Sequence, residues 1–140
     1  MAAFVLDTSI ALKWFLRDES DRAYSLAVLK SITDESPPAV PWLWYYEIAN
    51  TILTQVRRKR IVFEQAVVYL GIIDEMMIEV DPPDAAAILQ LPHLARTYNL
   101  TCYDAAFLEL AMRRQLPLAT SDEALIRAAE AAGVPMLIAP

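Results

Sequence analysis

The sequence has little of several residue types that define whole classes of protein. It holds one cysteine, Cys102, so a scaffold built on internal disulfides is excluded. Two glycines in 140 residues exclude collagen-like and glycine-rich linker classes. The single histidine, His93, and the single cysteine leave no ligand set for a structural or catalytic zinc site.

Long apolar runs are also missing. Charge-free stretches reach about 11 residues, as in Ser36 to Tyr46, whereas a membrane-spanning helix needs about 20. The apolar start, Ala2 to Leu6, is cut by Asp7 and lacks a preceding basic segment, so it does not read as a secretory signal. We therefore expect a cytoplasmic protein that does not insert into membranes.

Positive charge is scarce as well. Twelve basic against eighteen acidic side chains give a net charge of −6, which argues against nucleic-acid binding through a broad positive field. A nuclease stays open, because bound cations would offset an acidic pocket. The basic run Arg57 to Arg60 has two interpretations. It could contact phosphates, or it could form the solvated C-terminal end of a helix, where positive charge is favourable.

What the sequence does have is apolar content, 56%, enough for a sizeable core in one domain spanning residues 1–140. Short apolar runs predict strands, and apolar residues at helical spacing predict helices between them. The expected strands are Ala2–Leu6, Ala39–Val40, Ile78–Asp81, Leu116–Thr120 and Val134–Ala139. The expected helices are Ile10–Leu16, Asp21–Ile32, one opened by Pro41 and running through Val56, Phe63–Met77, Asp84–Tyr98 with a break or bend at Pro92, one begun by Asp104, and Asp122–Gly133.

Strands that alternate with helices imply right-handed βαβ crossovers and a parallel sheet. The predicted fold class is α/β, a three-layer sandwich with a central parallel sheet and helices on both faces. In such folds, ligands bind beyond the carboxyl ends of the strands, near the reversal in strand order.

Four acidic residues could meet at that edge. Asp7 and Asp122 each follow a predicted strand, while Asp104 and Glu47 lie on helices whose topology lets them converge there. Four close carboxylates need a compensating cation, and oxygen ligands select Mg²⁺ or Mn²⁺. The alternative reading is local: the three aspartates are ordinary helix caps, and Glu47 is a solvated helix residue.

Hydroxyl side chains flank the same positions and have two readings of their own. They could orient carboxylates or metal-bound water, or they could make local capping hydrogen bonds. These residues are Thr8, Ser9, Thr120 and Ser121.

An aromatic cluster lies just before Glu47. It could stack an unpaired base, although core or subunit-interface packing is the more ordinary reading. The cluster consists of Trp42, Trp44, Tyr45 and Tyr46.

Taken together, four short motifs carry a family resemblance. They are Asp7-Thr8-Ser9 after the first strand, Glu47 followed by Asn50, Tyr103-Asp104-Ala105-Ala106, and Leu118-Ala119-Thr120-Ser121-Asp122. In this order and at these distances, they resemble PIN-domain ribonucleases, and specifically VapC-type toxins. The likeness covers essentially the whole chain.

The resemblance implies a PIN fold whose active site binds Mg²⁺ or Mn²⁺ through four acidic residues. Carried onto this sequence, those residues are Asp7, Glu47, Asp104 and Asp122, with Thr8 and Thr120 or Ser121 as supporting hydroxyls. It also implies cleavage of RNA phosphodiester bonds, a homodimer, and a cognate VapB-like antitoxin.

Three other functions compete with this one. A phosphoacceptor signalling domain also uses an acidic cluster, but it needs a lysine near the last strands, and the only lysines are Lys13, Lys30 and Lys59. A non-catalytic module could receive a partner's basic side chains in the acidic pocket. A housekeeping RNA-processing PIN nuclease would share the site and lack the antitoxin.

Overall fold

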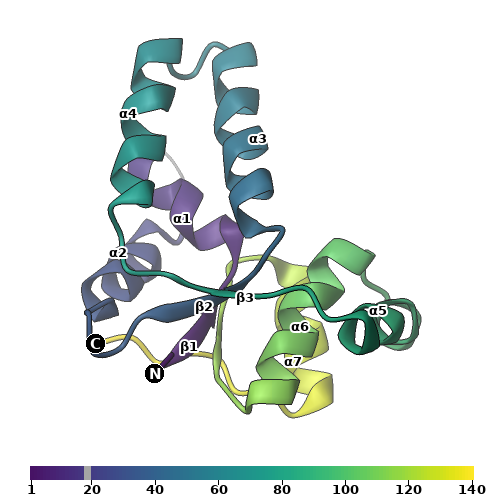
Figure 1. Ribbon diagram of the computed structural model, residues 1–140. Helices are drawn as coiled ribbons and strands as arrows, with labels where there is room; N and C mark the ends of the chain where they lie inside the picture. Colours follow the sequence, from purple (N-terminus) through teal and green to yellow (C-terminus); the bar gives the residue numbers. More distant parts are fainter. Residues whose placement is uncertain (18–19) are drawn as a thin grey trace.

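The computed structural model describes residues 1–17 and 20–140, and its centre is a parallel sheet in the order β3-β2-β1-β4 (Figure 1). The strands are β1 Phe4–Leu6, β2 Pro38–Pro41, β3 Glu79–Asp81 and β4 Leu118–Ala119. Within the described residues there are seven α-helices. They are α1 Thr8–Phe15, α2 Arg22–Ser31, α3 Trp44–Arg57, α4 Phe63–Asp74, α5 Ala85–Tyr98, α6 Cys102–Arg114 and α7 Glu123–Ala132.

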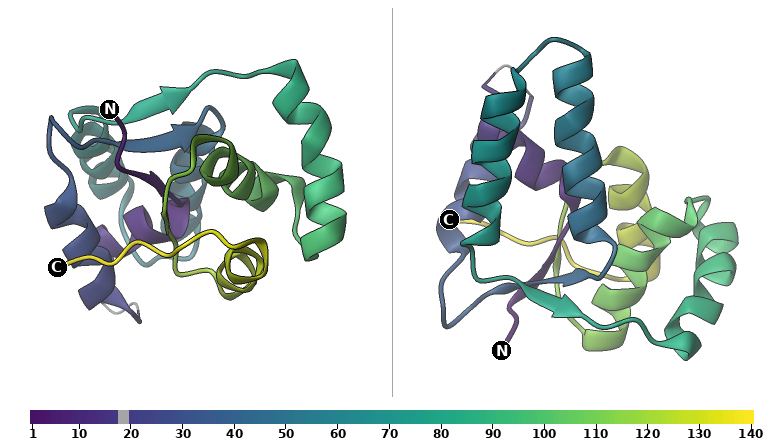
Figure 2. Two further views of the ribbon diagram at one scale, coloured as in Figure 1. Left: turned by 90° about the horizontal axis from the view of Figure 1, so that it is seen from below. Right: turned by 45° about the horizontal axis from the view of Figure 1, so that its top comes forward.

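The strand order reverses between β1 and β4. The chain adds β2 and β3 on one side of β1 and then crosses to place β4 on the other side. Right-handed crossovers then place α1 to α4 on one face of the sheet and α5 to α7 on the other. The packing agrees, because α1 contacts α2 and α3, while α6 contacts α5 and α7 (Figures 1 and 2). The predicted three-layer α/β sandwich is confirmed, and the reversal in strand order lies between β1 and β4, whose carboxyl ends are where folds of this kind bind ligands.

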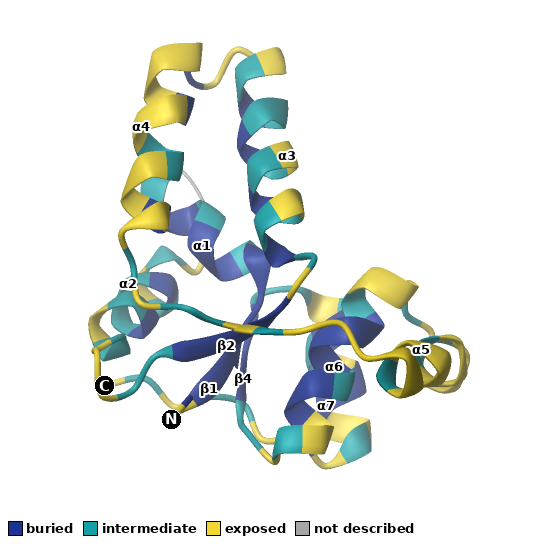
Figure 3. Cartoon of the chain, viewed as in Figure 1, coloured by how far each residue is buried: buried dark blue, intermediate teal, exposed yellow. Residues whose placement is uncertain are grey.

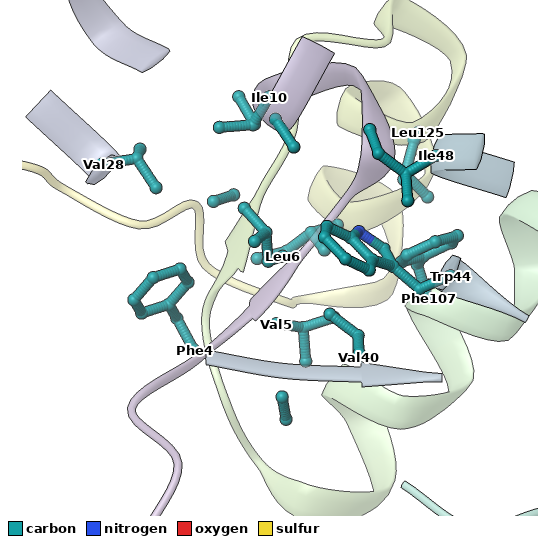
Figure 4. Close-up of a cluster of buried hydrophobic side chains, with 14 of the residues drawn as sticks. Phe4, Val5, Leu6, Ile10, Val28, Val40, Trp44, Ile48, Phe107 and Leu125 are labelled. Atoms are coloured by element: carbon teal, nitrogen blue, oxygen red, sulfur yellow. The ribbon is translucent and has the colours of Figure 1, made fainter. Parts of the chain in front are cut away.

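Apolar side chains fill the space between the sheet and its helices (Figure 4). Every residue of β1 is buried, as expected for a central parallel strand. Trp44 and Ile48 of α3 and Phe107 of α6 are fully buried around it. Burial of each such side chain contributes about 1.5–3 kcal/mol to the free energy of unfolding, because its apolar surface is removed from water. The core therefore fixes the strand ends and the first turns of α3 and α6 relative to one another.

The prediction that Pro41 opens a helix is wrong. Pro41 is the last residue of β2, paired with Asp81 of β3, and α3 begins at Trp44. Proline does suit a first helical turn, but here Pro41 is buried and its extended backbone continues the sheet. Burial at the strand end therefore outweighs that local preference.

The predicted strand Val134–Ala139 is also wrong, because only an isolated bridge between Leu118 and Met136 forms there. The Leu118 N–H donates to the Pro135 carbonyl over 2.9 Å, and the Leu137 N–H donates to the Leu118 carbonyl over 2.8 Å. A longer ladder has nothing to pair with, since β4 is two residues long. Pro135 moreover has no N–H to donate.

The helices follow the predicted periodicity more closely than the predicted ends. Helix α4 stops at Asp74, three residues before the predicted Met77. Helix α5 continues through Pro92 instead of breaking there. Proline removes one backbone hydrogen bond, to the Ile88 carbonyl, and water can replace it because α5 has no buried residue. Helix α7 has the predicted ends, with Asp122 at its start and Gly133 in a left-handed conformation, φ 75°, after its last residue.

Helices α4 and α5 carry many exposed residues (Figure 3), and several of these residues are apolar. Val67, Val68 and Ile72 of α4 and Leu89 of α5 are all exposed. None of the helices in the described part of the chain is both long and apolar enough to cross a bilayer. Exposed apolar surface of this kind is typical of contacts with other protein chains.

Candidate active site

Asp7 lies at the reversal in strand order, directly after β1, and is only 5% exposed. Its backbone N–H donates to the Ala119 carbonyl of β4 over 2.9 Å. Its carboxylate atom Oδ2 accepts one hydrogen bond from Thr120 Oγ1 and another from Ser9 Oγ, each 2.7 Å long. The side chain makes no capping hydrogen bond to α1, so the helix-cap reading does not hold for Asp7.

The two hydroxyls tie Asp7 to the loop that follows β4. Thr120 Oγ1 accepts from the Asp122 N–H, and Ser9 Oγ accepts from the Ser121 N–H, each over 3.0 Å. Because these backbone donors occupy oxygen lone pairs, both hydroxyl hydrogens are free to point at Asp7. The Ser121 hydroxyl itself is buried without a hydrogen-bond partner in the described structure, so its residue contributes through the backbone.

Glu47 approaches the site from the first turn of α3 and is half-buried. Thr8, the neighbour of Asp7, donates from Oγ1 to Glu47 Oε1 over 3.0 Å. Burial is the main cause that raises the pKa of Glu47 from 4.5 to about 7; the Thr8 hydrogen bond opposes this rise, and the charges of Asp7 and Asp104 contribute to it. Glu47 therefore changes its charge near neutral pH.

Asp104 lies in the first turn of α6 and does not cap that helix. The cap is Thr101, whose Oγ1 accepts from the Asp104 N–H over 3.1 Å. A threonine three residues before an acidic residue is the spacing of a capping box, so this signal is visible in the sequence. The carboxyl of Asp104 stays available for the site, and burial, then the charge of Asp122, raise its pKa.

Asp122 has two roles in the structure. It caps α7, because its Oδ2 accepts from the Leu125 N–H over 2.9 Å. Its charge also raises the pKa of both Asp7 and Asp104. The local and the functional readings of Asp122 are therefore compatible.

The four acidic side chains thus form one electrostatic cluster. Burial is the main cause of the raised pKa of Asp7, and the charges of Asp104 and Asp122 add to it. Repulsion of this kind is relieved either by protons or by a bound cation. The atoms available as metal ligands are all oxygens, which suits a hard ion such as Mg²⁺ or Mn²⁺.

The cluster is not a closed cage. In residues 1–17 and 20–140, no three His, Cys, Asp or Glu side chains form a group that could hold a metal ion by themselves. Mg²⁺ commonly keeps several waters and binds one or two carboxylates together with substrate phosphates. The residues therefore fit an open, water-rich metal site better than a closed one.

The aromatic cluster before Glu47 divides into two parts. Trp44 and Tyr45 pack edge to face inside, with ring centroids 5.1 Å apart, which confirms the core reading for this pair. Trp42 and Tyr46 are exposed instead. A groove beside Glu47 is lined by Leu43, Tyr46, Asn50 and Tyr103. Sequence reasoning missed Tyr103 as a neighbour of the site.

Comparison with known proteins gives one family. Residues 4–131 match the family model described as PIN domain. None of the curated proteins is significantly similar to the chain.

Solved structures share the fold at low sequence identity. PAE2754 from Pyrobaculum aerophilum matches 91% of this chain and 79% of its own, at 23% identity and a TM-score of 0.68. VapC20 from Mycobacterium tuberculosis, a sarcin–ricin loop cleaving toxin, matches 99% and 100%, at 15% identity and a TM-score of 0.72. VapBC2 from Rickettsia felis, bound to a DNA fragment from its promoter, matches 96% and 97%, at 14% identity and a TM-score of 0.65.

Proposed function

This chain belongs to the PIN domain family, a family of nucleases, and we propose that it is an endoribonuclease that uses Mg²⁺ or Mn²⁺. The observation that supports the proposal is the electrostatic interaction that links the carboxyl groups of Asp7, Glu47, Asp104 and Asp122 near the carboxyl edge of β1 and β4. Their arrangement around a buried Asp7 is costly without a cation, since the charges of Asp7, Asp104 and Asp122 each raise the pKa of at least one other member of the set. Helix caps that served only local structure would have no reason to interact electrostatically across four different elements.

Asp7 and Asp104 are the residues we assign to direct metal binding, with Asp122 and Glu47 completing the site. A bound ion would supply Lewis acidity and lower the pKa of a water molecule toward neutral. The protein's part is positional: Thr120 and Ser9 fix the Asp7 carboxylate, and Thr8 fixes Glu47. Without the ion, the pKa of Glu47 is about 7, so Glu47 can take up or release a proton near neutral pH; a bound cation would lower this pKa and favour the ionised form.

Cleavage of total cellular RNA tests the proposal directly. We expect fragments when the purified chain is incubated with Mg²⁺ or Mn²⁺, and intact RNA when a chelator removes the ions. Circular dichroism in the chelator serves as the control that the fold persists. Intact RNA with every divalent ion tried would contradict the nuclease and favour the non-catalytic module. Uptake of phosphate from acetyl phosphate would favour the phosphoacceptor domain.

We further propose that the protein is the toxin of a VapBC-like pair that acts in the cytoplasm as a homodimer. Two of the similar structures are a VapC toxin and a VapBC complex, which supports a VapB-like partner. The exposed apolar residues of α4 and α5 offer surface for a second copy and for an antitoxin. An antitoxin Arg or Lys inserted among the carboxylates would replace the cation and block substrate.

Expression in a bacterial host separates a toxin from a housekeeping nuclease. We expect growth arrest on induction of the wild-type chain and relief when the small reading frame next to its gene is co-expressed. The Asp7→Asn variant is the matched control and should not arrest growth. Arrest that no adjacent reading frame relieves would favour the housekeeping nuclease, as would normal growth combined with RNA cleavage in vitro.

A further inference from the structure

Two tyrosines stand exposed at the edge of the acidic cluster. Tyr46 of α3 is 71% exposed and Tyr103 of α6 is 66% exposed. Both line the groove that Glu47 also lines. Each tyrosine comes one position before an acidic residue of the site, so helices far apart in the sequence bring an aromatic ring and a carboxyl group to the same place.

The Tyr46 ring packs against another aromatic ring on one side. Trp42 packs edge to face against it, with ring centroids 5.9 Å apart. A tyrosine loses little conformational entropy when a ligand packs on it, because its side chain has only two rotatable angles. The groove therefore presents an aromatic surface that is partly fixed in place, open to solvent and next to the proposed nuclease site.

The exposed side of α3 continues away from the groove. Tyr46 and Asn50 are four residues apart and share one helix face, and Arg57 follows on that face two turns later. A rise of 1.5 Å per residue places Arg57 about 16 Å from Tyr46 along the helix. The face is uncharged beside the carboxylates and becomes basic only at its far end, where Arg57 and Arg58 are exposed.

We propose that the Tyr46–Tyr103 groove holds an unstacked base of the RNA substrate beside the scissile phosphate, with Asn50 facing the base edge. The inference rests on the proposed nuclease function and adds to it a site that binds one base of the substrate. A chain with a net charge of −6 gains little from general attraction to phosphates, whereas stacking on aromatic rings does not depend on charge. Bases within a duplex are already stacked, so the groove selects against double-stranded RNA.

The test compares a short single-stranded RNA with the same backbone carrying abasic residues, both bound to Asp7→Asn protein so that no cleavage intervenes. We expect Tyr46→Leu with Tyr103→Leu to weaken binding of the base-containing RNA about 10- to 100-fold. Binding of the abasic RNA should change little. In protein that keeps Asp7, the Tyr46→Leu and Tyr103→Leu substitutions together should raise KM for RNA cleavage by a similar factor. The Tyr46→Phe and Tyr103→Phe substitutions together should leave binding and KM at their wild-type values.

Phe63→Leu is the matched control, since Phe63 is an exposed aromatic residue at the far end of the α3–α4 hairpin. If the protein cleaves RNA yet binds base-containing and abasic RNA equally, the inference is overturned and the nuclease stands. A chain that neither binds nor cleaves RNA overturns both. If the leucine pair instead changes the oligomeric state in light scattering without changing RNA discrimination, the groove is an interface between copies and the inference fails.

Discussion

Replacing Asp7 with asparagine should abolish Mg²⁺-dependent RNA cleavage and, at the same time, make the metal-free protein more stable. The expected loss in kcat is about 10³- to 10⁴-fold, the scale seen when a group at the centre of a catalytic unit is removed. Asparagine keeps a side-chain oxygen for the Thr120 and Ser9 hydroxyls, so the local hydrogen bonds survive. What disappears is the negative charge that a cation needs.

The stability gain follows from the direction of the pKa shift. Burial, with the charges of Asp104 and Asp122, raises the pKa of Asp7 above 3.8 in the folded state. The folded protein therefore holds this proton more tightly than the unfolded chain does. Its contribution to stability is complete below pH 3.8 and is lost as the pH rises through the folded-state pKa. At neutral pH the ionised carboxylate opposes folding, and the neutral asparagine removes that opposition.

Two measurements on the same variant separate these effects. RNA cleavage should vanish, and thermal unfolding in a chelator should occur at a higher temperature than for wild type at pH 7. The difference should shrink at acidic pH, where wild-type Asp7 is protonated. Asp34→Asn, an exposed aspartate in the loop before β2, is the matched control and should change neither property. Full cleavage by Asp7→Asn would remove Asp7 from the site.

Local signals predicted the parts of the fold that depend on local interactions. Asp122 and Gly133 delimit α7 because capping and a left-handed residue act within one helical turn. Pro41 and Val134–Ala139 were mispredicted because sheet pairing decided their structure. The number of residues that β4 offers to a neighbour is a property of the tertiary structure, and no local pattern encodes it.

In the acidic site, too, some features could be predicted from the sequence, and others depend on the tertiary structure. Parallel strands end at one edge, so the sequence could predict that Asp7 and Asp122 approach each other. It could not show that Asp7 leaves the capping of α1 undone and takes two hydroxyl hydrogen bonds instead. One of those hydroxyls, on Thr120, is 113 residues away along the chain. Such a pairing depends on register between β1 and β4.

Thr120→Val should show what that hydroxyl does. Thr120 is 2% exposed, and valine has nearly the same shape, so the change removes two hydrogen bonds without opening a cavity. The Asp7 carboxylate loses a hydrogen-bond donor, and the Asp122 N–H loses its acceptor. Losing such a buried bond to a charged group costs about 1.5–3 kcal/mol of unfolding free energy. Activity should fall about 10- to 100-fold, as for other groups that orient a metal ligand.

If Thr120 had only a structural role, its replacement would lower stability without changing the pH dependence of cleavage. The pH profile of RNA cleavage therefore distinguishes the two roles. The Thr120 hydrogen bond lowers the pKa of Asp7 against the effect of burial. Without that bond the pKa rises further, more of Asp7 is protonated at neutral pH, and the acidic limb of the cleavage profile should move to higher pH. Thr120→Ser keeps the hydroxyl and should restore the wild-type profile. An unchanged profile in Thr120→Val, with only the melting temperature lowered, would show that Thr120 supports the fold and not the charge state of Asp7.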